Sequence, residues 1–164
     1  MILWCCIKKL LIAIGGLIVL GLAYWLISPL FITERVDEKI NDIMALPSGS
    51  PTATEAPMAP EIVSQGEFAG LAGHSGRGTA KLLFANGKHY IRLEDDFRVT
   101  NGPDLFVYFG KNGSYVSEAR IAALKGNEGG QNYEVPSDID PSQFSEVWIW
   151  CRAFSIPFAK TELR

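Results

Sequence analysis

The stretch that decides the fold is residues 79–94, which reads TAKLLFANGKHYIRLE. Asn86-Gly87 lies between two apolar runs, and this dipeptide favours a two-residue hairpin turn because both central positions need positive φ. A turn there places three pairs on one apolar face: Phe84 with His89, Leu82 with Ile91, and Ala80 with Leu93. Burial of that face would set the register of an antiparallel hairpin.

The rest of residues 61–164 continues this pattern of short alternating runs separated by turn residues. Such spacing predicts an all-β domain, an antiparallel β-sandwich or a barrel-like fold. Leu105–Phe109 and Val147–Cys151 are apolar on both faces, which is typical of central strands. We expect a short strand at Tyr133–Val135 and a final edge strand at Ser155–Leu163. Ile121–Leu124 fits either a strand or a helical turn.

The N-terminal part of the chain has a different character. Residues 10–32 contain no charged residue, and about 20 apolar residues at about 1.5 Å each cross the hydrocarbon core of a bilayer. Lys8 and Lys9 precede the run, so the positive-inside rule predicts a cytoplasmic segment at residues 1–9. We therefore predict a single transmembrane helix at 10–32, with the C-terminal domain outside the cytoplasm of the cell membrane.

Two rival interpretations of this run are less favoured. A cleaved signal peptide has a shorter apolar region and a small-residue cleavage site, whereas Trp25, Pro29 and Phe31 occupy those places. A lipoprotein is disfavoured because Cys5 and Cys6 precede the apolar run.

The sequence pattern predicts a helical stalk at residues 33–46. Thr33 can cap a short helix whose apolar positions, Val36, Ile40, Ile43 and Met44, follow helical spacing. This apolar stripe would rest on lipid headgroups or on the domain. Residues 47–60 read PSGSPTATEAPMAP, a Pro-rich linker that cannot bury enough surface to fold. We expect the domain boundary there.

Net charge and cysteine content argue against some classes of function. The net charge is -3 and no basic block is present, which argues against nucleic acid as a partner. Cys151 is the only cysteine after the apolar run, so the domain cannot form an internal disulfide. Val147 and Ile149 share the face of Cys151, which favours a buried Cys151 that packs as a small hydrophobic side chain. A reactive thiol would need exposure and a nearby cation, and Arg152 would point to the opposite face.

A metal site is not expected. His74, His89 and Cys151 offer two imidazoles and a thiolate, as in a blue-copper centre, but they are scattered along the chain. Asp95, Asp96 and Asp104 lie near turns and are more typical of solvated acids than of a calcium loop. No nucleophile-elbow or phosphate-loop pattern is present, so an enzyme is not expected.

Four segments carry a resemblance to a known family: GEFAGLAGHSGRGTAKL, GPDLFVYF, LKGNEGGQNYEVP and VWIWCRAFSIPFAKTEL. They resemble the DM-thirteen domain, the electron-transfer DM family of Skeletor-type and membrane-anchored microbial proteins. The resemblance implies an all-β extracytoplasmic module with a redox role for the cysteine that Cys151 matches. It supplies no cofactor, no substrate and no second thiol.

Two functional hypotheses follow. The first is a redox or electron-transfer accessory that uses Cys151 and acts on a protein partner at the outer membrane face. The second is a non-catalytic adhesion or assembly module in which Cys151 belongs to the core.

Overall fold

The structure is a computed structural model that describes residues 2–28, 32–45 and 59–164. The chain divides into two compact units, Met1–Ile32 and Thr33–Arg164. The boundary between the units therefore falls before Thr33, and not within the Pro-rich linker expected at residues 47–60. Residues 47–58 of that linker lie outside the described part of the chain. Residues 33–45 instead belong to the same unit as the β domain.

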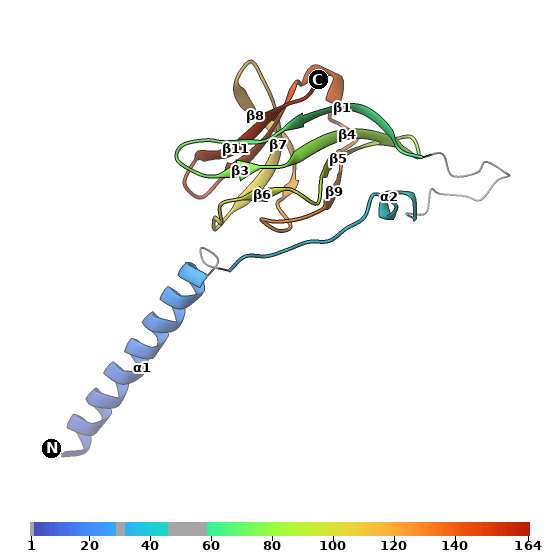
Figure 1. Ribbon diagram of the computed structural model, residues 1–164. Coiled ribbons are helices and arrows are strands. Elements are labelled where there is room, and N and C mark those ends of the chain that lie inside the picture. The colour runs from blue at the N-terminus through green and yellow to red at the C-terminus, as the bar shows by residue number, and fades with distance from the viewer. Residues whose placement is uncertain (1, 29–31, 46–58) are drawn as a thin grey trace. The chain divides into compact units, whose positions relative to one another are not determined.

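The first unit consists of helix α1 (Ile2–Ile27), which covers most of the predicted apolar stretch (Figure 1). Its described side chains from Leu11 to Tyr24 are largely exposed. Among the residues that the structure describes, no helix satisfies the length and hydropathy required to cross a membrane. The transmembrane anchor at residues 10–32 therefore stays a prediction.

The second unit is an all-β fold with two main antiparallel sheets (Figure 1). The first sheet has the strand order β1-β4-β5-β9, with bounds β1 (Glu61–Glu67), β4 (Thr79–Ala85), β5 (Lys88–Leu93) and β9 (Gln131–Glu134). The second has the order β2-β11-β10-β7-β8, with bounds β2 (Ala69–Gly70), β11 (Ile156–Glu162), β10 (Glu146–Cys151), β7 (Leu105–Lys111) and β8 (Ser114–Ala123). A small third ladder pairs β3 (Gly76–Arg77) with β6 (Arg98–Val99).

The predicted hairpin and its register are confirmed. β4 and β5 pair Ala80 with Leu93, Leu82 with Ile91, and Phe84 with His89. Asn86 and Gly87 both have positive φ, as a two-residue turn of this kind requires. Ala80, Leu82, Ile91 and Leu93 lie in the core, whereas Phe84, next to the turn, is exposed. Burial of one face thus sets the register.

The two predicted central strands are also confirmed. β10 lies between β11 and β7, and β7 lies between β10 and β8. Their inward residues join those of β4 and β5 in one hydrophobic cluster, so the two sheets pack as a sandwich. The fully buried members from β7 and β10 are Val107, Phe109, Val147, Ile149 and Cys151.

The remaining predicted strands are present, and one of them has a different position in its sheet. Tyr133 lies in the short strand β9, as predicted. Ile121–Ala123 extends β8, which settles the open alternative in favour of a strand. The final strand β11 is not an edge strand, because Ala159 and Lys160 pair with the two residues of β2. Pro157 is tolerated because it lies at a register shift, opposite Trp150.

Over the described residues 33–45, the helical stalk predicted for residues 33–46 is wrong except for α2 (Asp42–Ala45). Residues 33–45, here called the strap, run mostly extended along the β domain. The backbone N–H groups of Val36 and Glu38 donate to the carbonyls of Glu128 and Gly130 instead of to a preceding helical turn. Hydrogen bonds to another part of the chain thus replace those of a helix, which periodicity in the sequence does not reveal.

We predict that Gly110→Ala destabilises the sandwich. A Cβ at Gly110 would collide with the Trp148 indole, whose Nε1 donates to Glu146 at 2.8 Å. Such overpacking costs about 1–3 kcal/mol. Urea unfolding followed by tryptophan fluorescence measures the change in the free energy of unfolding.

Gly87→Ala is the matched comparison. No atom lies within 4 Å of its added Cβ, and only the positive φ of 76° is unfavourable, so the expected loss is about 1 kcal/mol. A loss at Gly87 larger than the loss at Gly110 would contradict the steric explanation.

Candidate functional site

Cys151 ends strand β10, where the alternation of that strand directs its side chain into the core. Its backbone partners are Leu105 on β7 and Ile156 on β11. The side chain is 0% exposed and carries a free thiol. A thiol without solvent contact packs as a small hydrophobic side chain. A soluble oxidant or metal ion cannot reach its sulfur in this conformation.

Arg152 does not activate this thiol. Its Nε lies 2.9 Å from Oδ2 of Asp104, and its guanidinium stacks 4.6 Å from the ring centroid of Phe106. The prediction that Arg152 points away from Cys151 is consistent with these contacts. Asp104, considered above as a calcium ligand, is therefore an ion-pair partner.

The histidines lie in separate aromatic contacts. His74 stacks on Phe158, with centroids 3.7 Å apart and an interplanar angle of 8°, and His89 lies 5.0 Å from the ring of Phe84 at the end of the hairpin. Among the residues that the structure describes, no three side chains of His, Cys, Asp or Glu are grouped so that they could hold a metal ion.

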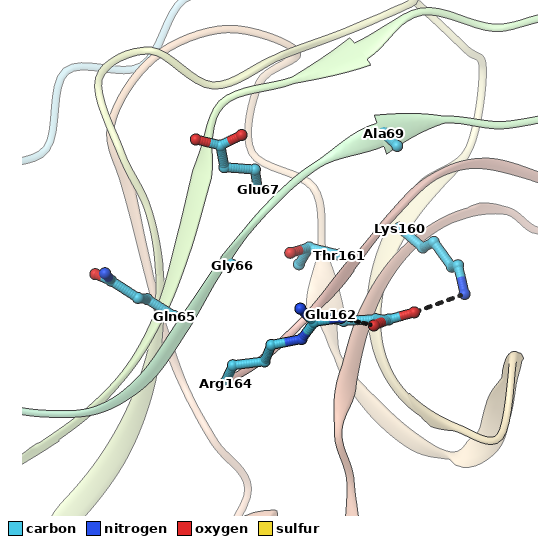
Figure 2. A pocket seen from close by; sticks show the side chains of 8 residues that line it. All are labelled: Gln65, Gly66, Glu67, Ala69, Lys160, Thr161, Glu162 and Arg164. Carbon is cyan, nitrogen blue, oxygen red and sulfur yellow. Dashed lines mark hydrogen bonds and ion pairs between the residues drawn. The ribbon is translucent and has the colours of Figure 1, made fainter.

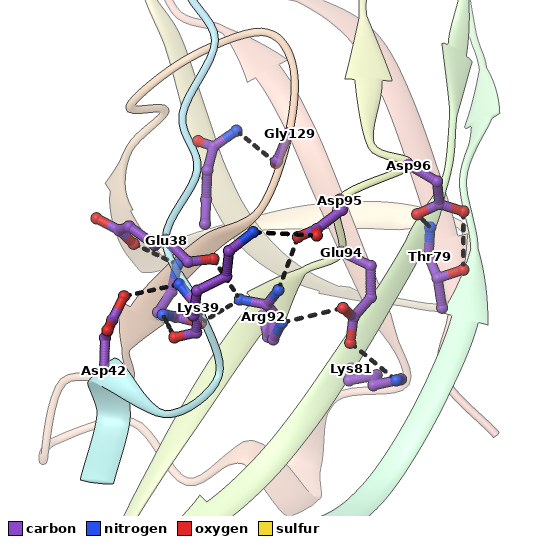
Figure 3. A network of polar contacts seen from close by, with 12 residues as sticks. Glu38, Lys39, Asp42, Thr79, Lys81, Arg92, Glu94, Asp95, Asp96 and Gly129 are labelled. Carbon is purple, nitrogen blue, oxygen red and sulfur yellow. Dashed lines mark hydrogen bonds and ion pairs between the residues drawn. The ribbon is translucent and has the colours of Figure 1, made fainter. Parts of the chain in front are cut away.

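A network centred on Arg92 covers the outer face of the first sheet (Figure 3). Arg92 is only 3% exposed, and its guanidinium lies 3.0 Å from carboxylate oxygens of both Glu94 and Asp95. It also donates to the Glu38 carbonyl at 3.1 Å and to Oδ1 of Asn132 at 2.9 Å. A buried guanidinium needs such partners, and one of them belongs to the strap.

The strap also carries a carboxylate that points to the domain. Glu38 accepts from Lys125 Nζ at 2.8 and 2.9 Å and from the Asn132 N–H at 2.7 Å. Asp37 points elsewhere, since its carboxylate meets Lys39 at 2.6 Å on the surface. Neighbouring acids of the strap therefore have different roles.

The other predicted turn acid, Asp96, accepts from the N–H of Thr79 at 3.1 Å and thereby ties the turn after β5 to the start of β4 (Figure 3).

A buried polar cluster shapes the loop that receives the strap. Gln131 is fully buried, and its amide donates to the Gly126 carbonyl at 2.8 Å and accepts from the Gly126 N–H at 3.1 Å. The hydroxyl of Tyr133 donates to Gln131 and accepts from the N–H of Lys125. Burial raises the pKa of the Tyr133 phenol above its ordinary value. These hydrogen bonds connect the two ends of the loop 126–130.

A pocket of about 340 Å³ opens where β1 leaves the first sheet for β2 (Figure 2). Half of its lining residues are charged, and Lys160 and Arg164 both lie near Glu162. Thr161 is 2% exposed, and its hydroxyl is the buried side-chain oxygen without a hydrogen-bond partner among the described residues. A Cβ at Gly66 would collide with the Glu162 carbonyl and lie 2.5 Å from that hydroxyl. The pocket has room for water, which could satisfy this hydroxyl.

Aromatic side chains cover the outer face of the second sheet. Tyr115 stacks on Trp150 with centroids 3.9 Å apart and meets Tyr108 edge-on at 5.3 Å. Arg120 and Arg152 lie over the ring of Phe106. These aromatic and cation–π contacts between neighbouring side chains stabilise the outer face of the sheet.

Sequence reasoning identified Cys151 and its core neighbours but missed the Arg92 network and the pocket at Gly66. The loop that receives the strap reads Gly126-Asn127-Glu128-Gly129-Gly130. Three glycines within five residues were the available signal, because glycine is used where another backbone approaches closely.

The fold and the Cys151 environment define a class: an antiparallel β-sandwich module with one thiol enclosed in its core. Residues 67–163 match the family model described as Electron transfer DM13. This match covers more than half of the chain, so the chain belongs to the DM13 family. The resemblance found in the sequence is confirmed. Comparisons with curated proteins and with solved structures give no significant match.

We predict that Cys151 is protected in the folded chain. In a Cys5→Ser/Cys6→Ser background, a thiol-reactive dye should label Cys151 only after unfolding in denaturant, because the side chain is 0% exposed. Labelling is followed by intact mass. Equal labelling rates in buffer and in denaturant would show that the thiol is exposed.

The raised pKa of Tyr133 predicts a pH dependence of stability. Above about pH 10 the unfolded chain ionises this phenol and the folded chain does not, so rising pH favours unfolding by about 1.4 kcal/mol per pH unit. The contribution is fully present below pH 10. Urea unfolding at pH 9 and pH 11 should show a shallower loss for Tyr133→Phe than for the wild type. Equal losses would contradict the prediction.

Proposed function

We propose that this protein is a single-pass membrane protein that presents its DM13 domain outside the cytoplasm as an accessory of electron transfer. In this proposal the domain acts by binding a protein partner at the outer membrane face, and Cys151 contributes to the core. The observation that carries it is the DM13 match over residues 67–163 combined with the complete burial of Cys151.

The membrane part of the proposal rests on the sequence. Residues 10–32 carry no charge, and Lys8 and Lys9 precede them. An uncharged stretch of this length favours a membrane-spanning helix, and the lysines favour a cytoplasmic N-terminus.

A second candidate function uses Cys151 as the redox group. It is motivated by the family's electron-transfer description and by the absence of any other cysteine after residue 6. In its simplest form, hydrogen peroxide oxidises the Cys151 thiol to sulfenic acid, and its O–O bond breaks with release of water. Such a step requires an opening of the core that exposes the sulfur.

The test compares three strains of the source cell: wild type, a strain lacking this chain, and one carrying Cys151→Ala. The readout is the reduction of ferricyanide, which does not cross the membrane, by intact cells. We expect the deletion to lower this rate and Cys151→Ala to retain it, with protein levels matched by immunoblot.

Each other outcome has a clear meaning. If Cys151→Ala at wild-type level behaves like the deletion, the second candidate is the better account. If the deletion changes nothing, the electron-transfer proposal is wrong. Release of the chain from membranes by alkaline carbonate would contradict the anchor.

A further inference from the structure

A second pocket, of about 350 Å³, lies where the strap meets the outer face of the first sheet. Carboxylates outnumber amines in its lining by three to one, and an aromatic and an aliphatic side chain complete it. The lining residues are Glu38, Asp42 and Ile43 of the strap and Tyr90, Lys125, Asn132 and Glu134 of the β domain.

The amine of this pocket is already fully used within the protein. Lys125 Nζ donates to the two carboxylate oxygens of Glu38 at 2.8 and 2.9 Å and to the Asn132 carbonyl at 2.7 Å. An ammonium group has three donors, so Lys125 has none left, and its charge balances that of Glu38. The negative charge that remains in the lining belongs to Asp42 and Glu134.

Asp42 and Glu134 each keep one carboxylate oxygen available. Oδ2 of Asp42 accepts from the backbone N–H of Lys39 at 2.7 Å (Figure 3), and Oε1 of Glu134 accepts from Lys88 Nζ at 2.7 Å. The other oxygen of each carboxylate has no hydrogen-bond partner among the described residues, and Asp42 has no ion-pair partner there either. The pocket therefore offers two free acceptors and an uncompensated negative charge.

Tyr90 adds a buried polar group with an open hydrogen-bonding position. The residue is only 3% exposed, with its ring packed against Ile43, Leu83 and Ala85. It nevertheless lines the pocket, and its hydroxyl has no hydrogen-bond partner within the part of the chain that the structure describes. Burial, together with the Glu134 carboxylate, raises the pKa of the Tyr90 phenol. A buried tyrosine hydroxyl usually has a partner, and the pocket provides the space for one.

These features favour an organic cation over a metal ion. The described residues contain no group of three His, Cys, Asp or Glu side chains that could hold a metal ion. An alkylammonium group has three N–H donors, which equals the number of free oxygens on Asp42, Glu134 and Tyr90. An aromatic face also attracts ammonium groups, and Ile43 and the Tyr90 ring offer apolar surface to an alkyl chain.

We propose that this pocket binds the ammonium group of an aliphatic amine. Its donors bond to the free oxygens of Asp42 and Glu134 and to the Tyr90 hydroxyl, and its alkyl chain lies against Ile43 and the Tyr90 ring. The amine is a free small molecule or the side chain of a lysine in a peptide. This inference is independent of the proposed membrane anchor and of the electron-transfer role.

The experiment titrates the full chain, in nonionic detergent micelles at neutral pH and physiological salt, with cadaverine and follows the heat of binding. The matched ligand is the diol of the same chain length, which has the alkyl chain without the charge. We expect saturable binding of the diamine and no measurable heat from the diol.

Three variants remove one ligand contact each. Asp42→Asn and Glu134→Gln keep an oxygen for Lys39 and Lys88, and each should raise the Kd about tenfold or more, because each removes a charged acceptor. Tyr90→Phe changes no charge at neutral pH and should raise the Kd about fivefold through the loss of one hydrogen bond.

Glu67→Gln is the matched charge control. Glu67 is exposed and lies on β1, at the opposite edge of the first sheet from β9. Since salt screens distant charges, its loss should change the Kd less than about twofold. Hydrogen-exchange protection of the Glu38 amide, which donates to Gly130 at 3.0 Å, reports that the strap stays bound in each variant. If Asp42→Asn loses this protection, Glu134→Gln and Tyr90→Phe decide the test.

Equal heats from the diamine and the diol would overturn the proposal. Equal losses of affinity in Glu67→Gln and Glu134→Gln would also overturn it, because they would indicate general attraction to a negatively charged protein. Once diamine binding is established, N-acetyl-lysine methylamide distinguishes the two sources. A Kd within about threefold of that of the diamine assigns the site to a lysine side chain, and weaker binding assigns it to a free amine.

Discussion

The structure depends on the alternation of two adjacent central strands, β7 and β10. One side of each strand faces the other sheet, and the opposite side carries aromatic rings. Val147 and Ile149 fix which side of β10 faces inward, since both are completely buried. Cys151 follows them at a spacing of two and must therefore enter the core. The constraint that packs the sandwich is thus the same one that removes the thiol from solvent.

The outer face of the first sheet carries both apolar and charged side chains, and these side chains are buried. Arg92, Leu83 and Tyr90 lie on it and are all buried. The strap resolves this by covering the face with Ile43 and by offering the Glu38 carbonyl to the Arg92 guanidinium. A segment outside the matched family region therefore completes the burial of the domain.

These two features have different functional meanings. The enclosed thiol argues for a domain that works through its surface. The strap adds contacts that the strands do not supply, since its Glu38 carbonyl accepts from Arg92 and its Ile43 side chain is buried against the first sheet.

The sequence by itself determined the hairpin at Asn86-Gly87, the two central strands and the inward direction of Cys151. These follow from turn chemistry and from period-two patterning, which are local. Only the tertiary structure decided that residues 33–45 lie extended on the domain, that β11 is covered by β2, and that Gly126, Gly129 and Gly130 receive the strap. Those features depend on hydrogen bonds and close contacts between segments far apart in the chain. Helical spacing at Val36, Ile40 and Ile43 carries no information about partners roughly 90 residues away, and so the local pattern predicted a helix where long-range contacts favour an extended chain.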